Sequence, residues 1–228
     1  MLDVHPPHEP VHGWRDFLLH LATITVGLLI ALGLEAAVEW IHHRQEVAET
    51  REALHAELQV NLGRFSANTT YFRQDLKSLQ GNLADFSYLQ QHPGASADKL
   101  PAKLIWTSSN ARMENSAWRT AHERGISAYM PQGEVMRENE LYSFYERIDK
   151  AHEEEADAVA EAIDYMFQNS DPAHMIATQI DREVELIKRV LSLHLRHAFL
   201  MQNLAEEFHD FEPAPTREEL QDALHMAN

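Results

Sequence analysis

The chain has 228 residues, of which 36 are Asp or Glu and 19 are Lys or Arg, so its formal net charge is −17 at pH 7. A surface this acidic repels phosphate backbones, and no basic cluster interrupts it, which excludes nucleic acid as a partner. The sequence contains no cysteine. Disulfides, thiolate nucleophiles and metal sites built on sulfur are therefore excluded as well.

The first 16 residues, MLDVHPPHEPVHGWRD, form a polar tail rich in His and Pro. Three histidines, His5, His8 and His12, lie close together in this tail. A tract of this composition can bind a soft divalent metal weakly, or it can be an ordinary solvated tail. The sequence leaves both possibilities open.

Residues 17–34, FLLHLATITVGLLIALGL, contain no charged side chain. At 1.5 Å per residue they form a helix of about 27 Å, close to the roughly 30 Å hydrocarbon core of a bilayer. Trp14 and Trp40 flank this run, as expected for indole rings that lie in the two headgroup layers. We therefore predict a transmembrane helix over residues 17–38, with both Trp side chains at the membrane interface.

Two alternatives to a membrane anchor are a buried helix of a soluble core and a cleaved signal peptide. The length of the run and its lack of charge favour a span over a buried helix. The preceding residues are acidic, and Leu34 and Glu35 stand where signal cleavage needs small side chains. We expect an uncleaved anchor whose partner is the lipid bilayer. Its orientation stays open because Arg15 on one flank nearly balances Arg44 and Arg51 on the other.

Small side chains recur every four residues within the span, at Thr23, Gly27 and Ala31. A stripe of small side chains lets two membrane helices approach closely. The stripe predicts a helix–helix contact in the membrane and, through it, a homodimer. The alternative is that these side chains face lipid and make no protein contact.

From about residue 45 to residue 90, apolar or small residues alternate at spacings of four and three. Four consecutive heptads predict a long helix with a narrow buried seam, as in a coiled coil or an elongated bundle. No proline occurs between residues 11 and 92, so this helix can continue directly out of the membrane. The seam consists of Leu58, Leu62, Phe65, Thr69, Phe72, Leu76, Leu79, Leu83 and Phe86.

A less regular stretch, residues 95–133, follows, and two long helical patterns come after it. Within the irregular stretch we expect a short helix around residues 114–124. The first long helix is predicted over residues 134–168. The second is predicted to begin at Asp171, which suits an N-cap, with Pro172 at the first helical position, and to end near residue 211.

Thr216 and Glu219 have the spacing of a capping box, which predicts a short helix within residues 212–228. Three long amphipathic helices cannot bury their apolar stripes singly. We therefore predict an all-α fold in which one N-terminal transmembrane helix continues into an elongated antiparallel bundle of three or four helices. The bundle domain is expected to span residues 39–211.

Two stretches of the chain resemble a known family. LATITVGLLIALGLEAAVEW is an apolar anchor that ends in Trp, and SAWRTAHERGISAYM leads into ELYSFYERI. Together they resemble an uncharacterised bacterial family of single-span membrane proteins with a helical soluble domain. The resemblance implies an anchor in the bacterial inner membrane and a helical domain outside the cytoplasm, and it implies no biochemical activity. The matching residues are Trp118, Gly125, Leu141, Tyr142 and Tyr145.

Fifteen histidines raise the question of metal binding. The pattern Glu-x-x-His places a carboxylate and an imidazole on one helical face, as in di-iron carboxylate bundles. Two such pairs lie in the predicted bundle, Glu52 with His55 and Glu206 with His209. They are candidate metal ligands if both pairs lie in the core and two further Glu join them.

A second candidate is a buried polar layer between the last two long helices. His152 lies on the apolar seam of one helix and His194 on or beside the seam of the next. Antiparallel packing sets the two within about 6 Å in height, with Glu155 and Arg189 as nearby partners. The layer can be structural, with hydrogen bonds that fix the register, or it can bind a metal ion or sense protons.

These patterns predict a membrane-anchored helical interaction or sensing module that is not an enzyme. We therefore assign no catalytic residue and no cofactor, and the sequence does not specify the protein partner. The alternative is a metal-dependent bundle enzyme with a di-iron-like or His-ligated centre. The sequence has no phosphate-binding Gly loop, no nucleophile elbow and no HExxH motif.

Overall fold

The computed structural model describes residues 13–107 and 110–227, and the three tail histidines lie outside these ranges. Within them the chain forms helices and turns but no strand, so the predicted all-α fold is confirmed. The elements in chain order are α1 (Trp14–Gln91), η1 (Ala97–Lys99), α2 (Ser116–Glu123), η2 (Ile126–Tyr129), α3 (Gln132–Gln168), η3 (Pro172–His174), α4 (Ala177–Glu207) and α5 (Arg217–Ala227).

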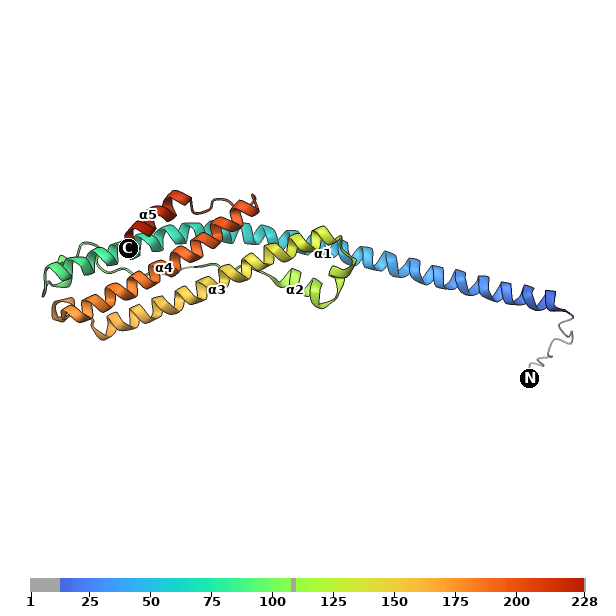
Figure 1. Cartoon of the computed structure of the whole chain (residues 1–228), viewed down its shortest axis with the longest axis horizontal. Helices are drawn as coiled ribbons and strands as arrows, with labels where there is room; N and C mark the ends of the chain where they lie inside the picture. Colours follow the sequence, from blue (N-terminus) through green and yellow to red (C-terminus); the bar gives the residue numbers. More distant parts are fainter. Residues whose placement is uncertain (1–12, 108–109, 228) are drawn as a thin grey trace.

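Helix α1 is a single element of 78 residues, which corresponds to a length of about 117 Å. Its amino-terminal part, residues 14–42, projects from the rest of the molecule, and we call it the apolar rod. The carboxyl-terminal part of α1 lies in the bundle (Figure 1). Buried side chains begin at Val47. Among the described residues, α1 is long and apolar enough to cross a membrane, and no residue of the 18-residue window that meets this criterion is buried.

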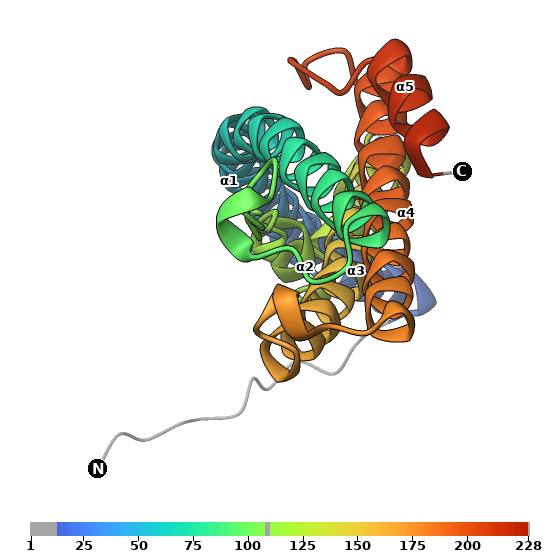
Figure 2. The same cartoon turned by 90° about the vertical axis from the view of Figure 1, so that its left-hand side faces the viewer.

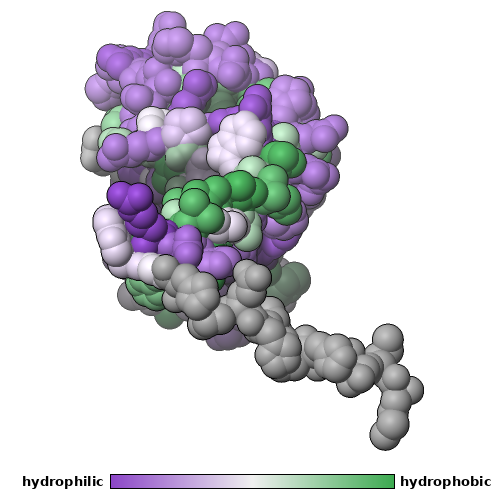
Figure 3. All heavy atoms as spheres, turned by 90° about the vertical axis from the view of Figure 1, so that its right-hand side faces the viewer, coloured by the Kyte–Doolittle hydropathy of each residue, from purple (hydrophilic) through white to green (hydrophobic). Residues whose placement is uncertain are grey.

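The projecting part of α1 carries large apolar side chains on its surface. Trp14 and Trp40, which bracket the apolar run, are 71% and 60% exposed. Seen from this end of the molecule, a band of hydrophobic side chains stands out against a mainly hydrophilic surface (Figure 3). The apolar surface is therefore concentrated on the projecting rod.

Helix α4 is the central element of the bundle, because it packs against α3, α1 and α5. It runs antiparallel to α1 and α3, and the end-on view shows α4 beside both of them (Figures 1 and 2). The core consists of two hydrophobic clusters. The proximal cluster, nearer the apolar rod, includes Phe65, Tyr145 and Met201. The distal cluster includes Phe86 and Leu191.

Residues 100–107 and 110–115 lack regular helical structure over most of their length, and α1 holds them with polar side chains. We call these residues the extended segment. Asn61 accepts a hydrogen bond from the backbone N–H of Glu114 at 2.8 Å and donates one to its carbonyl at 2.9 Å. Asn68 makes the same pair of bonds to Ala111, at 2.7 and 2.9 Å. Because backbone polar groups must find partners when they are buried, these amides replace the missing helical hydrogen bonds.

The other end of the extended segment is held in the same way. Asp85 accepts from the backbone N–H groups of Ala102 at 2.6 Å and Leu104 at 2.7 Å. Asn82 accepts from the backbone N–H of Ile105 at 2.9 Å.

The opposite side of the extended segment contacts α3. The indole N–H of Trp106 donates to the sulfur of Met166 at 3.2 Å, and the backbone N–H of Met113 donates to Asp149 at 3.3 Å. The segment is therefore bonded to α1 on one side and to α3 on the other.

Two predicted helix boundaries are wrong. Asp171 does act as a cap, since its carboxylate accepts from the N–H of Ala173 at 3.0 Å, but it caps the short turn η3. Helix α4 begins only at Ala177, where the Gln179 side chain accepts from the N–H of Ile176 at 2.9 Å. At the other end, α4 stops at Glu207 rather than near residue 211.

The predicted capping box before α5 is confirmed. The N–H of Glu219 donates to the Thr216 hydroxyl at 3.2 Å, and the N–H of Thr216 donates to the Glu219 carboxylate at 2.7 Å. The same carboxylate binds Arg73 of α1 at 2.6 Å. The cap therefore also ties the terminal helix to α1.

Substitution of Asn68 tests the role of the polar side chains on α1. We expect Asn68→Ala to lower the free energy of unfolding by about 2 kcal/mol, because two partly buried backbone groups of Ala111 lose their partner. Urea unfolding of the full chain in detergent, followed by circular dichroism, measures the difference. Gln59→Ala, at an exposed position of the same helix, is the control and should change little. Equal effects of the two substitutions would contradict the assignment.

Candidate functional site

A layer of polar side chains crosses the bundle where the proximal and distal clusters meet. We call it the His–Glu layer, and it consists of His152 and Glu155 on α3 and His194 and His197 on α4. Glu155, His194 and His197 are buried, whereas His152 is half-buried. Each pair is spaced by three residues, so both members lie on one face of their helix.

Glu155 and His194 form the centre of the layer. The Nδ1 atom of His194 lies 2.6 Å from one carboxylate oxygen of Glu155. Its Nε2 atom lies 3.0 Å from the backbone carbonyl of Phe72 on α1, and the Phe72 ring stacks on the imidazole at 4.7 Å. Three helices therefore meet through this one histidine.

Both ring nitrogens of His194 face acceptors, so both carry hydrogen and the ring is an imidazolium paired with a carboxylate. Burial opposes the ionised form of Glu155, but hydrogen bonds from His194 and His197 outweigh it and lower the pKa to about 2. Burial likewise opposes the charged form of His194, and the bond to Glu155 outweighs it, so the pKa of His194 is raised. The layer thus contains a buried ion pair.

His197 and His152 complete the layer. The Nδ1 atom of His197 lies 3.0 Å from the second carboxylate oxygen of Glu155, to which it donates. Its Nε2 atom is buried and has no hydrogen-bond partner in the part of the chain that the structure describes. The His152 ring lies 5.7 Å from the His197 ring, centroid to centroid. Burial and the charge of His197 lower the pKa of His152.

The structure brings together three of the four residues predicted for a polar layer. His152, Glu155 and His194 all lie in the His–Glu layer. Arg189 does not, because its side chain is exposed and binds Glu161 at 2.5 Å. His197, the fourth member of the layer, was not predicted. Its spacing from His194 could have indicated it, because a residue one helical turn away lies on the same face.

The two Glu-x-x-His pairs lie elsewhere. Glu52 and His55 are exposed on α1, and Glu206 and His209 are exposed at the end of α4 and just beyond it. Glu206 binds Arg217 at 2.7 Å. The group of possible metal ligands found among the described residues is instead His152, Glu155 and His197.

Tyr142, one of the residues that carry the family resemblance, contacts a second buried carboxylate, Glu57 of α1. The Tyr142 hydroxyl donates to Glu57 at 2.5 Å, and the first residues of α2 donate to its other oxygen from Ser116 Oγ at 2.8 Å and the Ala117 N–H at 2.9 Å. The Trp118 ring stacks on Tyr142 at 6.0 Å. These contacts fix α2 and α3 to α1, which gives Trp118 and Tyr142 a structural role.

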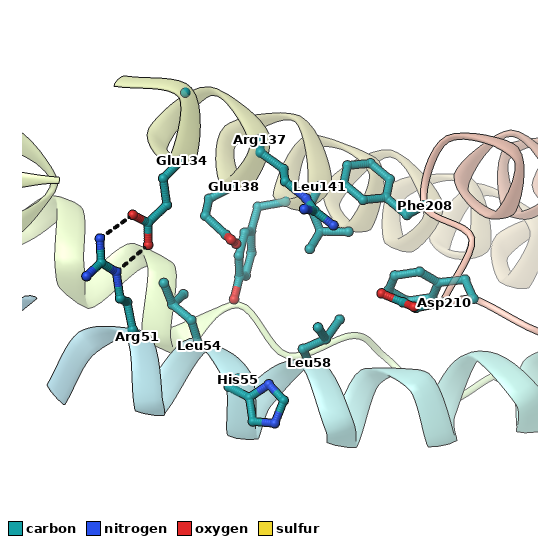
Figure 4. A pocket seen from close by; sticks show the side chains of 13 residues that line it. Arg51, Leu54, His55, Leu58, Glu134, Arg137, Glu138, Leu141, Phe208 and Asp210 are labelled. Carbon is teal, nitrogen blue, oxygen red and sulfur yellow. Dashed lines mark hydrogen bonds and ion pairs between the residues drawn. The ribbon is translucent and has the colours of Figure 1, made fainter. Parts of the chain in front are cut away.

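A cavity of about 530 Å³ opens beside this region (Figure 4). His55 and Leu58 line it from α1, Arg137 and Glu138 from α3, and Asp210 from the segment after α4. Burial raises the pKa of Glu138. Charged and apolar side chains both line the cavity. One of them is His55, a member of the predicted Glu52 and His55 pair.

Comparison with known proteins does not add to this picture. The chain matches no protein-family model, no curated protein and no solved structure.

Glu183 of α4 is a buried carboxylate outside the His–Glu layer. Its side chain is fully buried, and neither carboxylate oxygen has a hydrogen-bond partner within the described ranges. Burial raises the pKa of Glu183 to about 7. The folded protein therefore binds a proton here more tightly than the unfolded chain does, and this contribution to stability is lost as the pH rises from about 4.5 to 7.

We expect Glu183→Gln to raise the free energy of unfolding by up to about 3 kcal/mol at pH 8, because the substitution removes a buried charge. At pH 4 the two proteins should be nearly equal, since Glu183 is then protonated in both states. Urea unfolding at the two pH values measures the difference. Glu185→Gln, at an exposed position, is the control. A gain of the same size at both pH values would contradict a titrating buried carboxylate.

Proposed function

We propose that this chain is a single-pass membrane protein whose helical bundle works as an interaction or sensing module without catalysing a reaction. The observation that carries the proposal is the apolar rod of α1, which has exposed apolar side chains on every side. Phe17, Leu29 and Ile41 are 60%, 62% and 59% exposed. At 3.6 residues per turn these three positions point in directions about 120° apart.

A helix that is apolar all round is stable only inside a protein core or a bilayer. The rod of α1 is not covered by the bundle (Figure 1). Soluble proteins rarely expose contiguous apolar patches of more than a few hundred Å². The guanidinium of Arg44 lies 5.3 Å above the Trp40 ring, an arrangement that suits the membrane interface. A bilayer around the rod would therefore remove these apolar side chains from water.

The proposal includes a location in the bacterial inner membrane and assembly as a homodimer. The family resemblance supports the bacterial inner membrane as the location, with the bundle on the extracytoplasmic side. The Thr23, Gly27 and Ala31 stripe supports a homodimer formed through the span. The net charge of −17 belongs almost wholly to the residues outside the span, so anionic lipid repels the bundle and favours its standing away from the surface.

Binding is favoured over catalysis by the position of the His–Glu layer. A metal-dependent enzyme would have to bring its substrate to His152, Glu155 and His197, and two of these three are buried. The layer joins α1, α3 and α4, so a change in its state acts directly on the helix that carries the anchor. This coupling is what a sensing module requires.

Carbonate extraction of membranes from cells that produce the full chain tests the anchor. We expect the protein to stay in the membrane pellet. Leu28→Arg combined with Leu29→Arg should release it, because two arginines near the centre of a span cost about 5 to 7 kcal/mol on insertion scales. Phe199→Arg combined with Leu224→Arg places the same charges on exposed apolar positions of the bundle and should leave the protein in the pellet. Release of the unmodified protein into the soluble fraction would contradict the proposal.

A further inference from the structure

A second cavity, of about 570 Å³, lies where the apolar rod meets the bundle. Ala36 and Trp40 of the rod and Val47 of the bundle line it from α1, and Tyr129 and Pro131 line it from the residues before α3. Ala36, Trp40 and Val47 are spaced by four and seven residues, so they lie on one face of the helix. Val47 is buried, whereas Trp40 is 60% exposed. The face of α1 that packs into the bundle therefore extends onto the rod, where it faces the cavity.

Two aromatic side chains give the cavity walls that are apolar with a polar edge. Tyr129 stacks on the His43 imidazole with 3.6 Å between the ring centroids, and more than half of its surface is exposed. Trp40 is exposed to a similar degree. Tyr and Trp are enriched at the membrane interface, because each has an apolar ring and a polar tip. The cavity therefore has the side-chain composition of a membrane–water boundary.

One positive charge in the wall of the cavity is left without a counter-charge. Arg51 binds the Glu134 carboxylate through two hydrogen bonds, at 2.7 and 2.6 Å (Figure 4). The Glu39 carboxylate lies 3.5 Å from Nε2 of His43. Arg44, in contrast, forms no ion pair with any residue in the described ranges. An unpaired guanidinium in a chain of net charge −17 indicates a site for an anionic group.

The guanidinium of Arg44 lies at the depth of lipid headgroups in the proposed membrane placement. The side chain points back along α1, so that its charge lies 5.3 Å from the centre of the Trp40 ring. Trp40 follows the end of the span, residue 38, by two residues or about 3 Å. The headgroup layer on each side of a bilayer is about 5 to 7 Å thick. The unpaired charge and the aromatic walls therefore lie in the layer that contains the phosphates of the lipids.

We propose that this cavity binds one phospholipid of the surrounding bilayer, with the phosphodiester on Arg44 and the headgroup against Trp40 and Tyr129. A phosphodiester carries one negative charge, which matches the one unpaired guanidinium, and Arg can donate two parallel hydrogen bonds to it. The acyl chains continue past Ala36 along the apolar rod, which excludes a fully polar phosphate compound as the natural occupant. The inference rests on the proposed membrane anchor and names a lipid partner at the bundle end of that anchor.

Native mass spectrometry of the full chain in detergent, with three added molecules compared, tests the site. Phosphatidylethanolamine has a phosphodiester and acyl chains but no net charge, so the net charge of the protein neither attracts nor repels it. Diacylglycerol has the acyl chains without the phosphate, and glycerophosphoethanolamine has the phosphate without the acyl chains. We expect one phosphatidylethanolamine to remain bound per chain, and neither of the other two molecules at the same concentration.

Substitution of Arg44 locates the bound lipid. Arg44→Gln should weaken the binding of phosphatidylethanolamine roughly tenfold, because the phosphate loses a charged hydrogen-bond donor. Arg15→Gln is the matched control, since Arg15 lies 6.0 Å from the centre of the Trp14 ring at the other end of the rod and does not line the cavity. Its affinity should be unchanged. Both arginines are exposed, and circular dichroism confirms that each variant is folded.

Three results would overturn the lipid site: no phosphatidylethanolamine bound, equal binding of diacylglycerol or glycerophosphoethanolamine, or equal affinities in the Arg44→Gln and Arg15→Gln variants. The membrane proposal fails on a different measurement. A protein that binds phosphatidylethanolamine but is released by carbonate would keep the lipid site and reject the anchor. A protein that stays in the membrane but binds no phosphatidylethanolamine would keep the anchor and reject the lipid site.

Discussion

The other elements of the bundle depend on helix α1 for their position, because α1 runs without a break from the apolar rod into the protein core. Its amino-terminal part exposes apolar side chains all round, whereas from Val47 onward it buries one face against other helices. No proline interrupts the 78 residues, so backbone hydrogen bonding continues across the boundary. A displacement of the bundle end of α1 therefore reaches the rod through a continuous helix.

Polar side chains determine how the other elements attach to α1. Asn61, Asn68 and Asn82 are spaced by seven or fourteen residues and bind the extended segment, residues 100–107 and 110–115. The Phe72 carbonyl, on the same stretch of α1, accepts from His194 and connects the His–Glu layer. An apolar seam alone tolerates a shift of one helical turn, but these hydrogen bonds do not, because a shift would leave buried polar groups without partners.

Periodicity and charge predicted the helices, because burial of an apolar stripe governs where long helices form. The start of α4 was missed because Asp171 and Pro172 carry the signals of a helix start but form a 3₁₀ turn. The layer of His152, Glu155 and His194 could be anticipated from register along antiparallel helices. The free nitrogen of His197 could not, since it depends on side-chain orientation and on which groups find partners in the folded chain.

The apolar rod and the bundle share one continuous helix, and a distance between two spin labels tests this most directly. The chain has no cysteine, so Leu32→Cys and Gln59→Cys give a single pair of labels in the full chain in lipid nanodiscs. Both positions are exposed and lie 27 residues apart. A continuous helix predicts one narrow distribution near about 40 Å. A broad distribution, or one centred well below that distance, would contradict it.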